Sequence, residues 1–483
     1  MPTWEQPLAE RFLNARASRR VGALLVTAVV LAACGGTHRA VEAHPSRAPS
    51  VVVAVDAARA GRVVPRAFLG LSIEWDSVGA YAGPSGRRSA GLRALLAPLV
   101  ARTGGVALRV GGDTADQAWW NPRGRPRPGS VLQDVTRATL DDVAWLARGL
   151  RGPVTLDVNL PLSDPYNALA LARAARRRLP RGSLDTLEIG NEPDLYTRGR
   201  VFHVPGHVHH RLRKRVRYDA AAYRRDVTPY LDVLSRRPPP AERLAVAGFA
   251  GPAWWPSLPG LVRSAGGRVG ALSAHLYALP RCGGRAPPVS WLLTSAASRG
   301  RVASLAPLVA IARTQRLPVR VTELNSAACG GRPRWSESFP AALWLTDTLF
   351  ALLRDGVDQA DVHTWAHARY AVFDVAGTRA MARPPLTAML AFARAAPPMS
   401  RLIATGGRLG PLRAWATVDR GGTVRVALIA RGAVRARLVT GRPGCAEVWL
   451  ATVRGARSAH TCPRADRIPI EMPANAIAVV TMR

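Results

Sequence analysis

Residues 184–194 have the sequence LDTLEIGNEPD, an aliphatic run that ends on polar residues. The run Leu184–Gly190 is a candidate buried strand, and Asn191 and Glu192 follow it directly. Similar runs lie on both sides of it along the chain. They are Phe68–Trp75, Val106–Val110, Val154–Asn159, Leu244–Gly248, Ala271–Tyr277, Pro318–Leu324 and Gln359–Thr364. Together they make eight candidate strands.

Amphipathic stretches with helical spacing separate these candidate strands. Examples are Ala90–Arg102, Leu140–Leu150, Tyr166–Leu179, Tyr218–Leu234, Leu305–Arg316 and Phe339–Arg354. Eight strand–helix units over about 330 residues are typical of a (β/α)8 barrel with insertions. A doubly wound α/β sheet is the competing fold, but it usually has a glycine-rich phosphate loop after its first strand. Phe68–Trp75 leads into no G-x-G-x-x-G, so we predict a TIM barrel over residues 65–398.

The C-terminal part of the chain has a different pattern. After about Ser400 the helical period stops, and short β-like runs follow. They are Leu412–Val418, Thr423–Ile429, Ala436–Val439, Glu447–Ala451 and Ile477–Met482. These runs predict an all-β sandwich over residues 399–483. The segment 51–64, which begins with the β-branched run Val51–Val55, precedes the barrel and is expected to join the sandwich as an N-terminal strand.

The N-terminus predicts export from a bacterial cell. An arginine-biased segment precedes the apolar stretch Val21–Ala33, which is too short to span a bilayer comfortably. It ends in Leu31-Ala32-Ala33-Cys34, which resembles a bacterial lipoprotein box and implies lipidation of Cys34. We therefore expect a signal peptide over 1–33, a linker over 34–50, and a protein held at the outer face of the membrane by its lipid anchor only. An ordinary secretory signal with an incidental cysteine is the alternative.

Composition excludes several classes of protein. Hydrophobic residues make up 48% of the 483-residue chain, which excludes disorder, collagen and coiled coil. The net charge is +35, a value that by itself suggests polyanionic partners. Lys214 is the only lysine, however, so the charge is arginine spread along the whole chain, as GC-rich coding produces. Since no zinc-finger, RNP or helix-turn-helix pattern accompanies it, we expect no nucleic-acid partner.

Four cysteines remain when Cys34 is set aside, and they allow three disulfide pairings. Proximity in the sequence favours Cys445–Cys462, which leaves Cys282–Cys329. An oxidising compartment permits both bonds. Cys282 and Cys329 follow the sixth and seventh candidate strands, so their disulfide would join two neighbouring loops at the barrel mouth.

Two of the strand ends carry a glutamate in polar company. Glu192 follows the fourth candidate strand, and Glu323 ends the seventh in the sequence VRVTELN. Loops at the carboxyl ends of barrel strands converge, so the two carboxyls are expected to face each other across the mouth. Cleavage of a glycosidic bond needs such a pair, one protonated and one ionised. The alternative is that each glutamate is a surface or helix-capping residue.

With these motifs the chain resembles the retaining barrel glycosidases of clan A. More narrowly, it is similar to glycoside hydrolase family 79, the β-glucuronidase and heparanase-like enzymes. The matching motifs are FLGLSIEW at 68–75, LRVGGDTADQAWW at 108–120, LEIGNEPD at 187–194, HLY at 275–277, TELNSAACGG at 322–331 and IPIEMPANAIAVVTM at 468–482. The resemblance covers roughly residues 51–483.

The resemblance implies a role for each residue of a site. Glu192 would be the general acid/base and Glu323 the nucleophile, and Asn191 would bind the sugar 2-hydroxyl. Arg109 and Tyr277 would hold Glu323 ionised, because an arginine beside a carboxylate depresses its pKa. The further substrate-binding candidates are His275, Asp113, Asn325 and Trp120, of which Trp120 could equally pack in the core. Two carboxyls suffice for this reaction, so we expect a carbohydrate substrate and no cofactor or metal.

Two departures from the family pattern bear on the substrate. Asp113 stands where family members often have Asn or Thr, and it adds a negative charge near the sugar. The loop Ser326–Ala328 lacks the tyrosine that would help backbone N–H groups bind a uronic carboxylate. A β-glucuronidase therefore remains the main hypothesis. The alternatives are a clan A β-glycosidase for a neutral sugar, and a non-catalytic envelope lipoprotein that binds glycans.

Overall fold

The computed structural model describes residues 48–128, 131–198, 218–366, 368–407, 409–439, 444–463 and 466–482. The predicted signal peptide, Cys34 and positions 34–47 of the predicted linker lie outside the described residues. In the parts of the chain that are described, no helix is both long and apolar enough to cross a membrane.

Eight parallel strands in the described residues close into a barrel, in the order β10-β11-β2-β3-β6-β7-β8-β9. The strands are β2 (Leu69–Glu74), β3 (Val106–Gly111), β6 (Arg151–Val158), β7 (Leu184–Ile189), β8 (Arg243–Phe249), β9 (Ala271–Leu279), β10 (Val319–Ala327) and β11 (Gln359–Thr364). Each coincides with one of the eight candidate strands, so the predicted TIM barrel is confirmed. The strands were recognisable because both faces of a barrel strand are buried and therefore mostly apolar.

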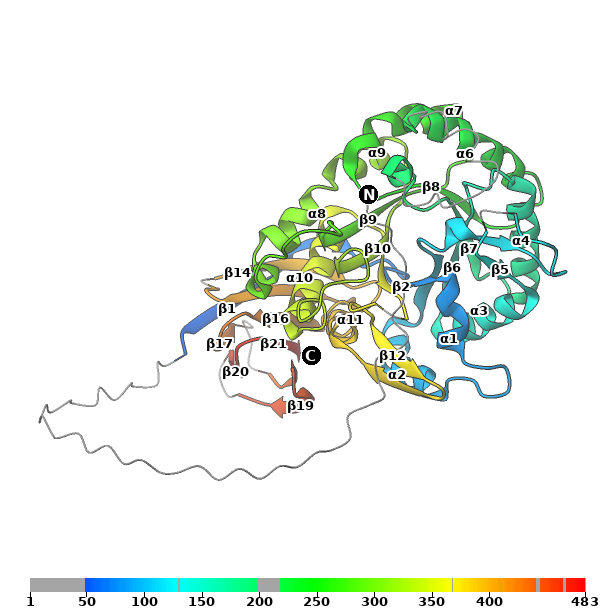
Figure 1. The fold of residues 1–483 in the computed structure, drawn as a ribbon. Helices are drawn as coiled ribbons and strands as arrows, with labels where there is room; N and C mark the ends of the chain where they lie inside the picture. Colours follow the sequence, from blue (N-terminus) through cyan, green and yellow to red (C-terminus); the bar gives the residue numbers. More distant parts are fainter. Residues whose placement is uncertain are drawn as a thin grey trace, which may run out of the picture. The chain divides into compact units, whose positions relative to one another are not determined.

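Helices surround the barrel on its outside (Figure 1). The longer ones are α2 (Ala90–Thr103), α3 (Arg137–Leu150), α4 (Pro165–Arg178), α6 (Ala220–Leu234), α9 (Ala306–Thr314), α10 (Phe339–Asp355) and α11 (Pro384–Ala395). The shorter ones are α1 (Val78–Ala82), α7 (Leu258–Ser264) and α8 (Arg301–Ala303). Local sequence sets their ends, as at α3, where Thr136 and Thr139 form a reciprocal capping box.

Short strands and helical turns lie between the larger elements of the barrel. Two-stranded ribbons form from β4 (Ala118–Trp120) with β5 (Gln133–Val135), and from β12 (Phe373–Ala376) with β13 (Arg379–Ala382). Single helical turns follow several strands: η1 (Trp75–Ser77), η2 (Ala115–Gln117), η3 (Pro193–Arg198), η4 (Pro252–Ser257), η5 (Val289–Leu293) and η6 (Ala296–Gly300).

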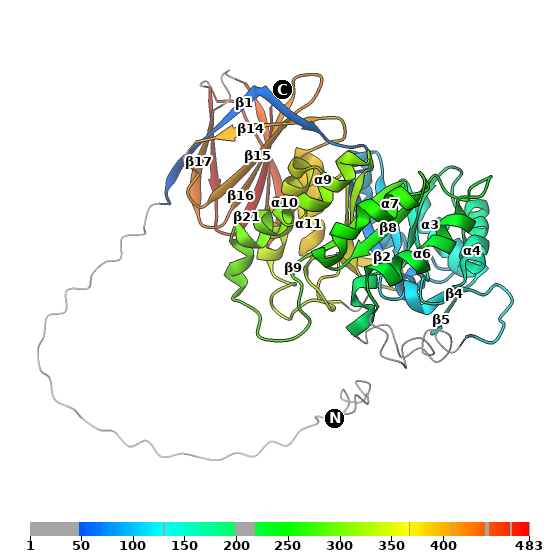
Figure 2. The ribbon, with the colours of Figure 1, turned by 90° about the horizontal axis from the view of Figure 1, so that it is seen from above.

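The remaining strands form a second, all-β domain. In the described residues it is one nine-stranded sheet, in the order β19-β18-β21-β16-β15-β14-β1-β17-β20. The strands are β1 (Ser50–Val63), β14 (Arg401–Gly406), β15 (Leu412–Val418), β16 (Val424–Ala430), β17 (Val434–Val439), β18 (Ala446–Thr452), β19 (Gly455–Thr461), β20 (Arg467–Met472) and β21 (Ala476–Met482). β1 pairs antiparallel with β14 and parallel with β17, which confirms the expected N-terminal strand (Figure 2).

The two ends of this sheet share one hydrophobic core. Leu438 of β17 and Ile470 of β20 belong to the same buried cluster as Val426 of β16 and Val480 of β21. The sheet therefore curls into two packed layers, as a sandwich does. The strands β14, β19 and β20 were not among the predicted runs. The sequence of β19, GARSAHT, is almost wholly exposed and has no apolar alternation.

The β-domain also packs against barrel helices. Alternate residues of β16 face opposite ways, so Ala427 and Ile429 join the barrel core while Val426 and Leu428 face the sandwich. Trp415 of β15 stacks on Phe350 of α10, with ring centroids 5.5 Å apart, and its Nε1 donates to Asp347 at 2.8 Å. Because α10 is covered on both sides, almost its whole surface is buried.

Candidate active site

The two predicted glutamates lie together at the barrel mouth. Glu323 lies in the middle of strand β10, and Glu192 follows β7. A carboxylate oxygen of each lies within 4.8 Å of the other. Both line a pocket of about 340 Å³ above the strand ends. The side chain of Glu323 is only 6% exposed, whereas that of Glu192 is 14% exposed.

Glu323 is held by hydrogen bonds on both carboxylate oxygens. The hydroxyl of Tyr277 donates to Oε2 at 2.7 Å, and Nη1 of Arg109 donates to Oε1 at 2.9 Å. Burial by itself would raise the pKa of Glu323, but the nearby His275, His363 and Arg109 and the Tyr277 hydroxyl outweigh it. The pKa therefore lies well below the usual range, and Glu323 is ionised.

Arg109 donates hydrogen bonds to several buried side chains, among them Glu323 of the pocket. It is fully buried at the end of β3, and its Nε donates to Glu188 at 2.6 Å. Its Nη2 donates to Asp157 and to Asn191, each at 3.0 Å. The planar fork of a guanidinium suits this arrangement, because several fixed donors leave one group. The sequence placed Arg109 here, but it did not indicate that Glu188 and Asp157 share it.

Glu192 has an unusual backbone conformation and a histidine partner. Its φ is +45°, in the left-handed region, and its N–H donates to the carbonyl of Gly248 at 3.0 Å. Nδ1 of His275 lies 2.9 Å from Oε1 of Glu192 and 3.6 Å from Oε2 of Glu323. Burial alone would lower the pKa of His275, but the charge of Glu323 and the bond to Glu192 raise it. The raised pKa favours the protonated imidazole, which lies between the two carboxyls.

The buried Asn191 pairs with Asp113, which lines the pocket. The Oδ1 of Asn191 accepts from Arg109, and its Nδ2 donates to Oδ1 of Asp113 at 3.2 Å. These two bonds fix the orientation of the amide and leave its second N–H for a ligand. Asp113 is exposed at the rim. Desolvation by the surrounding pocket raises the pKa of Asp113, and so do the charges of Glu74, Glu192 and Glu323. Solvent at the rim screens part of this effect.

Sequence reasoning missed four pocket residues: Glu74, His363, Trp365 and Tyr370. Glu74 ends β2, and its Oε1 lies 3.3 Å from Nε2 of His363, near the end of β11. Glu74 also accepts the N–H of Asp113 at 3.1 Å. The strand-end rule that selected Glu192 would have found Glu74 and His363, because each is a polar residue at the end of a predicted strand. Tyr370 lies beyond β11, where no motif marked it.

The same side chains have the donor types that divalent metals bind. Glu74, Glu323 and His363 each offer a ligand atom within 4.8 Å of the others, as do Glu192, His275 and Glu323. Most of these atoms already bind one another or a neighbouring donor. Among the described residues, Nε2 of the buried His275 has no hydrogen-bond partner.

Of the predicted substrate-binding residues, Asp113 and Tyr277 line the pocket. Asn191, Arg109 and His275 hydrogen-bond to side chains that line it. Asn325 and Trp120 do neither. Asn325 is buried, and its Nδ2 donates to the carbonyls of His363 at 2.7 Å and Tyr370 at 3.1 Å. It satisfies buried backbone groups of the loop that carries Tyr370, so it acts on the wall rather than on a ligand. Trp120 lies in β4 within the hydrophobic core, and its backbone pairs with the amide of Asn167. Its ring is therefore a packing group of the core.

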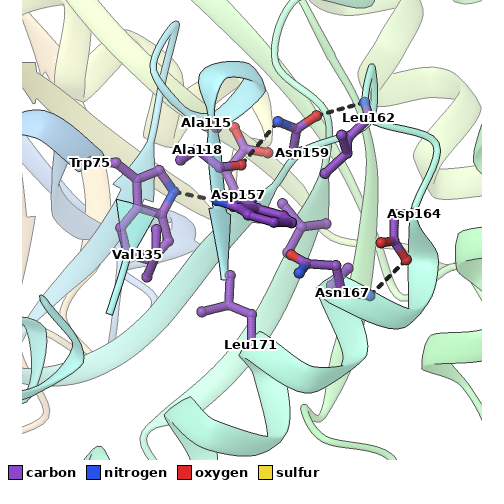
Figure 3. Close-up of a pocket in the computed structure, with 13 residues that line it drawn as sticks. Trp75, Ala115, Ala118, Val135, Asp157, Asn159, Leu162, Asp164, Asn167 and Leu171 are labelled. Carbon is purple, nitrogen blue, oxygen red and sulfur yellow. Dashed lines mark hydrogen bonds between the residues drawn. The ribbon is translucent and has the colours of Figure 1, made fainter. Parts of the chain in front are cut away.

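A second pocket of about 290 Å³ lies beneath that ribbon (Figure 3). Trp75, Trp119 and Val135 form its apolar wall, and Asn159 and Asn167 stand opposite. Trp75 Nε1 donates to the carbonyl of Asp157 at 3.1 Å, and Asn159 Nδ2 donates to that of Ala118 at 2.9 Å. The first bond holds Trp75 of η1 to β6, and the second holds the ribbon to the residue that follows β6.

The structure pairs Cys282 with Cys329 and Cys445 with Cys462. The first disulfide joins the loops that follow β9 and β10, and Cys329 itself lines the pocket beside Ala328 and Gly330. It therefore ties the wall near Glu323 to the loop after the strand that carries Tyr277. The second disulfide links β18 to the segment after β19 in the β-domain.

No family model matches the sequence, and no curated protein matches it. Solved structures match the fold. A 4-O-α-L-rhamnosyl-β-D-glucuronidase from Fusarium oxysporum 12S has a TM-score of 0.67 at 18% identity, covering 90% of this chain and 99% of its own. A GH51 arabinofuranosidase from Xanthomonas axonopodis pv. citri has a TM-score of 0.68 at 15% identity, covering 90% of this chain and 100% of its own.

A more distant match is the catalytic domain of the GH30 xylanase C from Talaromyces cellulolyticus. Its TM-score is 0.56 at 12% identity, and it covers 89% of this chain and 100% of its own. At these identities the matches establish the architecture, a TIM barrel with a β-domain, and leave the reaction to be argued from the site.

Proposed function

We propose that this protein is a retaining β-glycoside hydrolase in which Glu192 is the acid/base and Glu323 the nucleophile. The observation that carries the proposal is the proximity of the two carboxyls across the barrel mouth, with oxygens within 4.8 Å. Retaining enzymes hold their carboxyls about 5–5.5 Å apart, whereas inverting enzymes leave room for a water at about 6.5–9.5 Å. The close spacing supports retention.

The surroundings of the two carboxyls support different roles. Arg109 and Tyr277 keep Glu323 ionised, as a nucleophile must be. Glu192 has no arginine bond among the described contacts, and it is the more exposed of the two. It can therefore reach the oxygen of a leaving group.

The reaction would proceed in two displacements. In the first, Glu323 attacks the anomeric carbon while Glu192 donates its proton to the departing glycosidic oxygen, so that the bond to the aglycone breaks as the glycosyl–enzyme ester forms. In the second, Glu192 takes a proton from water, which attacks the same carbon and releases Glu323. Asn191, held by Arg109 and Asp113, would donate its remaining N–H to the sugar 2-hydroxyl.

For the sugar itself we propose a β-glucuronide. The family resemblance implies that backbone N–H groups after the nucleophile and a tyrosine bind the uronic carboxylate. Ala328, Cys329 and Gly330, in the loop after the nucleophile strand, line the pocket together with Tyr370. Its ring centroid lies 6.2 Å from that of Tyr277. Tyr370 could therefore take the place of the tyrosine that the loop lacks.

A neutral sugar is the second candidate, and the charge of the pocket favours it. The cavity is lined by four carboxyl side chains, those of Glu74, Asp113, Glu192 and Glu323. Arg109 already donates its hydrogen bonds to Glu188, Glu323, Asp157 and Asn191. An anionic glycone would meet repulsion from Asp113 when that carboxyl is ionised, above its raised pKa of about 8. The substrate panel below separates the two candidates.

The decisive experiment assays the purified protein against aryl β-glycosides of glucuronic acid, glucose, xylose and arabinose. Glu323→Gln should abolish release. A 2-fluoro glycoside should label Glu323 in the wild type, as detected by mass spectrometry of the peptide. Release from the glucuronide supports the full proposal. Release from a neutral sugar alone supports the hydrolysis but refutes the glucuronide as its substrate. If neither release nor labelling occurs on any aryl glycoside, the protein is not this hydrolase, and the glycan-binding alternative takes precedence.

We also propose that the protein is exported and lipidated at Cys34, on the sequence LAAC at 31–34. Mass spectrometry of the mature N-terminus after expression in a bacterium tests this. A diacylglyceryl group on Cys34 is the expected result. A cleaved but unmodified Cys34 would point to secretion without an anchor.

A further inference from the structure

Asp194 lies two residues after Glu192 and uses both of its carboxylate oxygens on a neighbouring loop. Oδ1 accepts the N–H of Ala250 at 2.9 Å, and Oδ2 accepts the N–H of Gly251 at 3.0 Å. These two amides belong to the segment that leaves β8, the next strand of the barrel. The side chain of Asp194 therefore clamps the loop after β8 to the segment that carries Glu192.

The end of β8, directly before that loop, holds the backbone of Glu192. The carbonyl of Gly248 accepts the N–H of Glu192 at 3.0 Å. The end of β8 is bent for this purpose: Ala247 and Gly248 have φ of +88° and +53°, and the register with β9 shifts between Ala247 and Phe249. Their amides are satisfied by side chains, the Tyr223 hydroxyl at 3.0 Å and the Ser273 hydroxyl at 3.1 Å.

The conformation of Glu192 needs such support. A residue with a Cβ in the left-handed region costs about 1–2 kcal/mol relative to the right-handed one. The following Pro193 also restricts Glu192 and favours extended backbone. Such a conformation persists only where its surroundings enforce it. The bond from Glu192 to Gly248 and the two bonds from Asp194 to Ala250 and Gly251 tie the same two segments together on both sides of Pro193. Together they enforce the backbone conformation of Glu192.

We propose that Asp194 is a positioning residue: by clamping the loop after β8 it orients the Glu192 carboxyl for proton transfer to the leaving group. The inference rests on the proposed function, and it adds to it a residue that touches neither the substrate nor His275. Acid catalysis matters most when the leaving group is a poor one, so the effect should depend on the aglycone.

The test compares Asp194→Ala and Asp194→Asn with the wild type on two aryl glycosides of whichever sugar the wild type hydrolyses. On the methoxyphenyl glycoside, whose phenol needs a proton to depart, kcat/KM should fall on the order of tenfold for Asp194→Ala and less for Asp194→Asn. On the dinitrophenyl glycoside, whose phenol departs without one, the fall should be under about twofold. Asp419→Ala is the matched control, because Asp419 binds the N–H groups of Gly421 and Thr423 in the β-domain.

A second measurement needs no substrate. Hydrogen exchange followed by mass spectrometry should show faster exchange in the peptides around Glu192 and Ala250 in Asp194→Ala, with β10 unchanged. Equal losses on both glycosides, or unchanged exchange at these peptides, would overturn the proposal. A wild type inactive on every glycoside would refute the proposed hydrolysis instead, and the exchange data would still decide whether Asp194 holds Glu192.

Discussion

The Tyr277 hydroxyl and the Arg109 guanidinium bind different oxygens of Glu323: Tyr277 donates to Oε2 at 2.7 Å and Arg109 to Oε1 at 2.9 Å. The carboxylate is therefore held in one plane, with its charge stabilised from both sides. Side chains from β9, β3 and β10 meet in this arrangement, so it exists only in the closed barrel.

Removal of the tyrosine donor should weaken the nucleophile without harming the fold. In Tyr277→Phe, we expect kcat to fall on the order of 10- to 100-fold, since a charge-assisted hydrogen bond to the carboxylate is lost. Steady-state kinetics measures this. Tyr81→Phe is the control, because the buried Tyr81 hydroxyl binds Thr364 and neither residue lines the pocket. Equal losses in the two variants would contradict a specific role.

Arg109→Lys should damage both stability and activity. A lysine retains the charge but cannot supply the fork that binds Glu188, Asp157 and Glu323 together. Breaking a buried pair costs about 3–5 kcal/mol, so the melting temperature should drop clearly. Arg62→Lys changes a half-buried arginine that binds Asp358 away from the site, and it should leave kcat unchanged. An active, fully stable Arg109→Lys would refute the assignment.

The folded protein should lose stability as the pH rises from about 5 to about 8. Burial would lower the pKa of His275 and of His363, but the charge of Glu323 raises both. Their stabilising contribution is complete below the ordinary histidine pKa of about 6.5 and disappears as the pH passes the raised value. Burial raises the pKa of Asp361 to about 7, so ionisation of Asp361 destabilises the fold in the same window.

Scanning fluorimetry at several pH values measures this trend. The variant His363→Gln should show a shallower decline, because one of the raised groups is gone. Glu323 acts in the opposite direction and only in acid: its pKa is depressed, so its contribution is lost as the pH falls below the ordinary glutamate range. A melting temperature that rises between about pH 5 and pH 8 would contradict the prediction.

Asp113 should oppose an anionic sugar where it is ionised, that is, in assays above its raised pKa of about 8. Asp113→Asn keeps an oxygen for the Asn191 amide and removes only the charge at the rim. We expect the ratio of kcat/KM for glucuronide over glucoside to rise several-fold, on the order of 3- to 10-fold for a screened charge a few ångströms away. Asp142→Asn, which neutralises a carboxylate paired with Arg88 on the outer helices, should leave the ratio unchanged.

The disulfide at the pocket wall should affect substrate binding more than folding of the barrel. With Cys282 and Cys329 both replaced by serine, the wall around Cys329 gains freedom, and KM should rise several-fold. The matched variant replaces Cys445 and Cys462, whose bond lies in the β-domain. It should change the melting temperature but not KM. The opposite pattern would show that the wall is held by other contacts.

Much of the architecture follows from the sequence alone, for a local reason. A barrel strand is buried on both faces, so its apolar run is visible without knowledge of its neighbours, and all eight runs were found. Convergence of the strand ends then predicts that Glu192 and Glu323 meet, and that Arg109 and Tyr277 lie near them. The exposed strand β19 escaped because it carries no such pattern.

The tertiary structure decided which side chains share a bond. The pairing of Glu74 with His363 joins residues that are distant in the chain, as does the bond from Glu192 to Gly248. The same holds for Asn325 and Trp120, whose polar and aromatic groups face loops and core rather than the pocket. Sequence periodicity determines which face of an element is buried. The distance between two side chains on different strands depends on closure of the whole barrel, and that closure is what turned two glutamates at strand ends into one site.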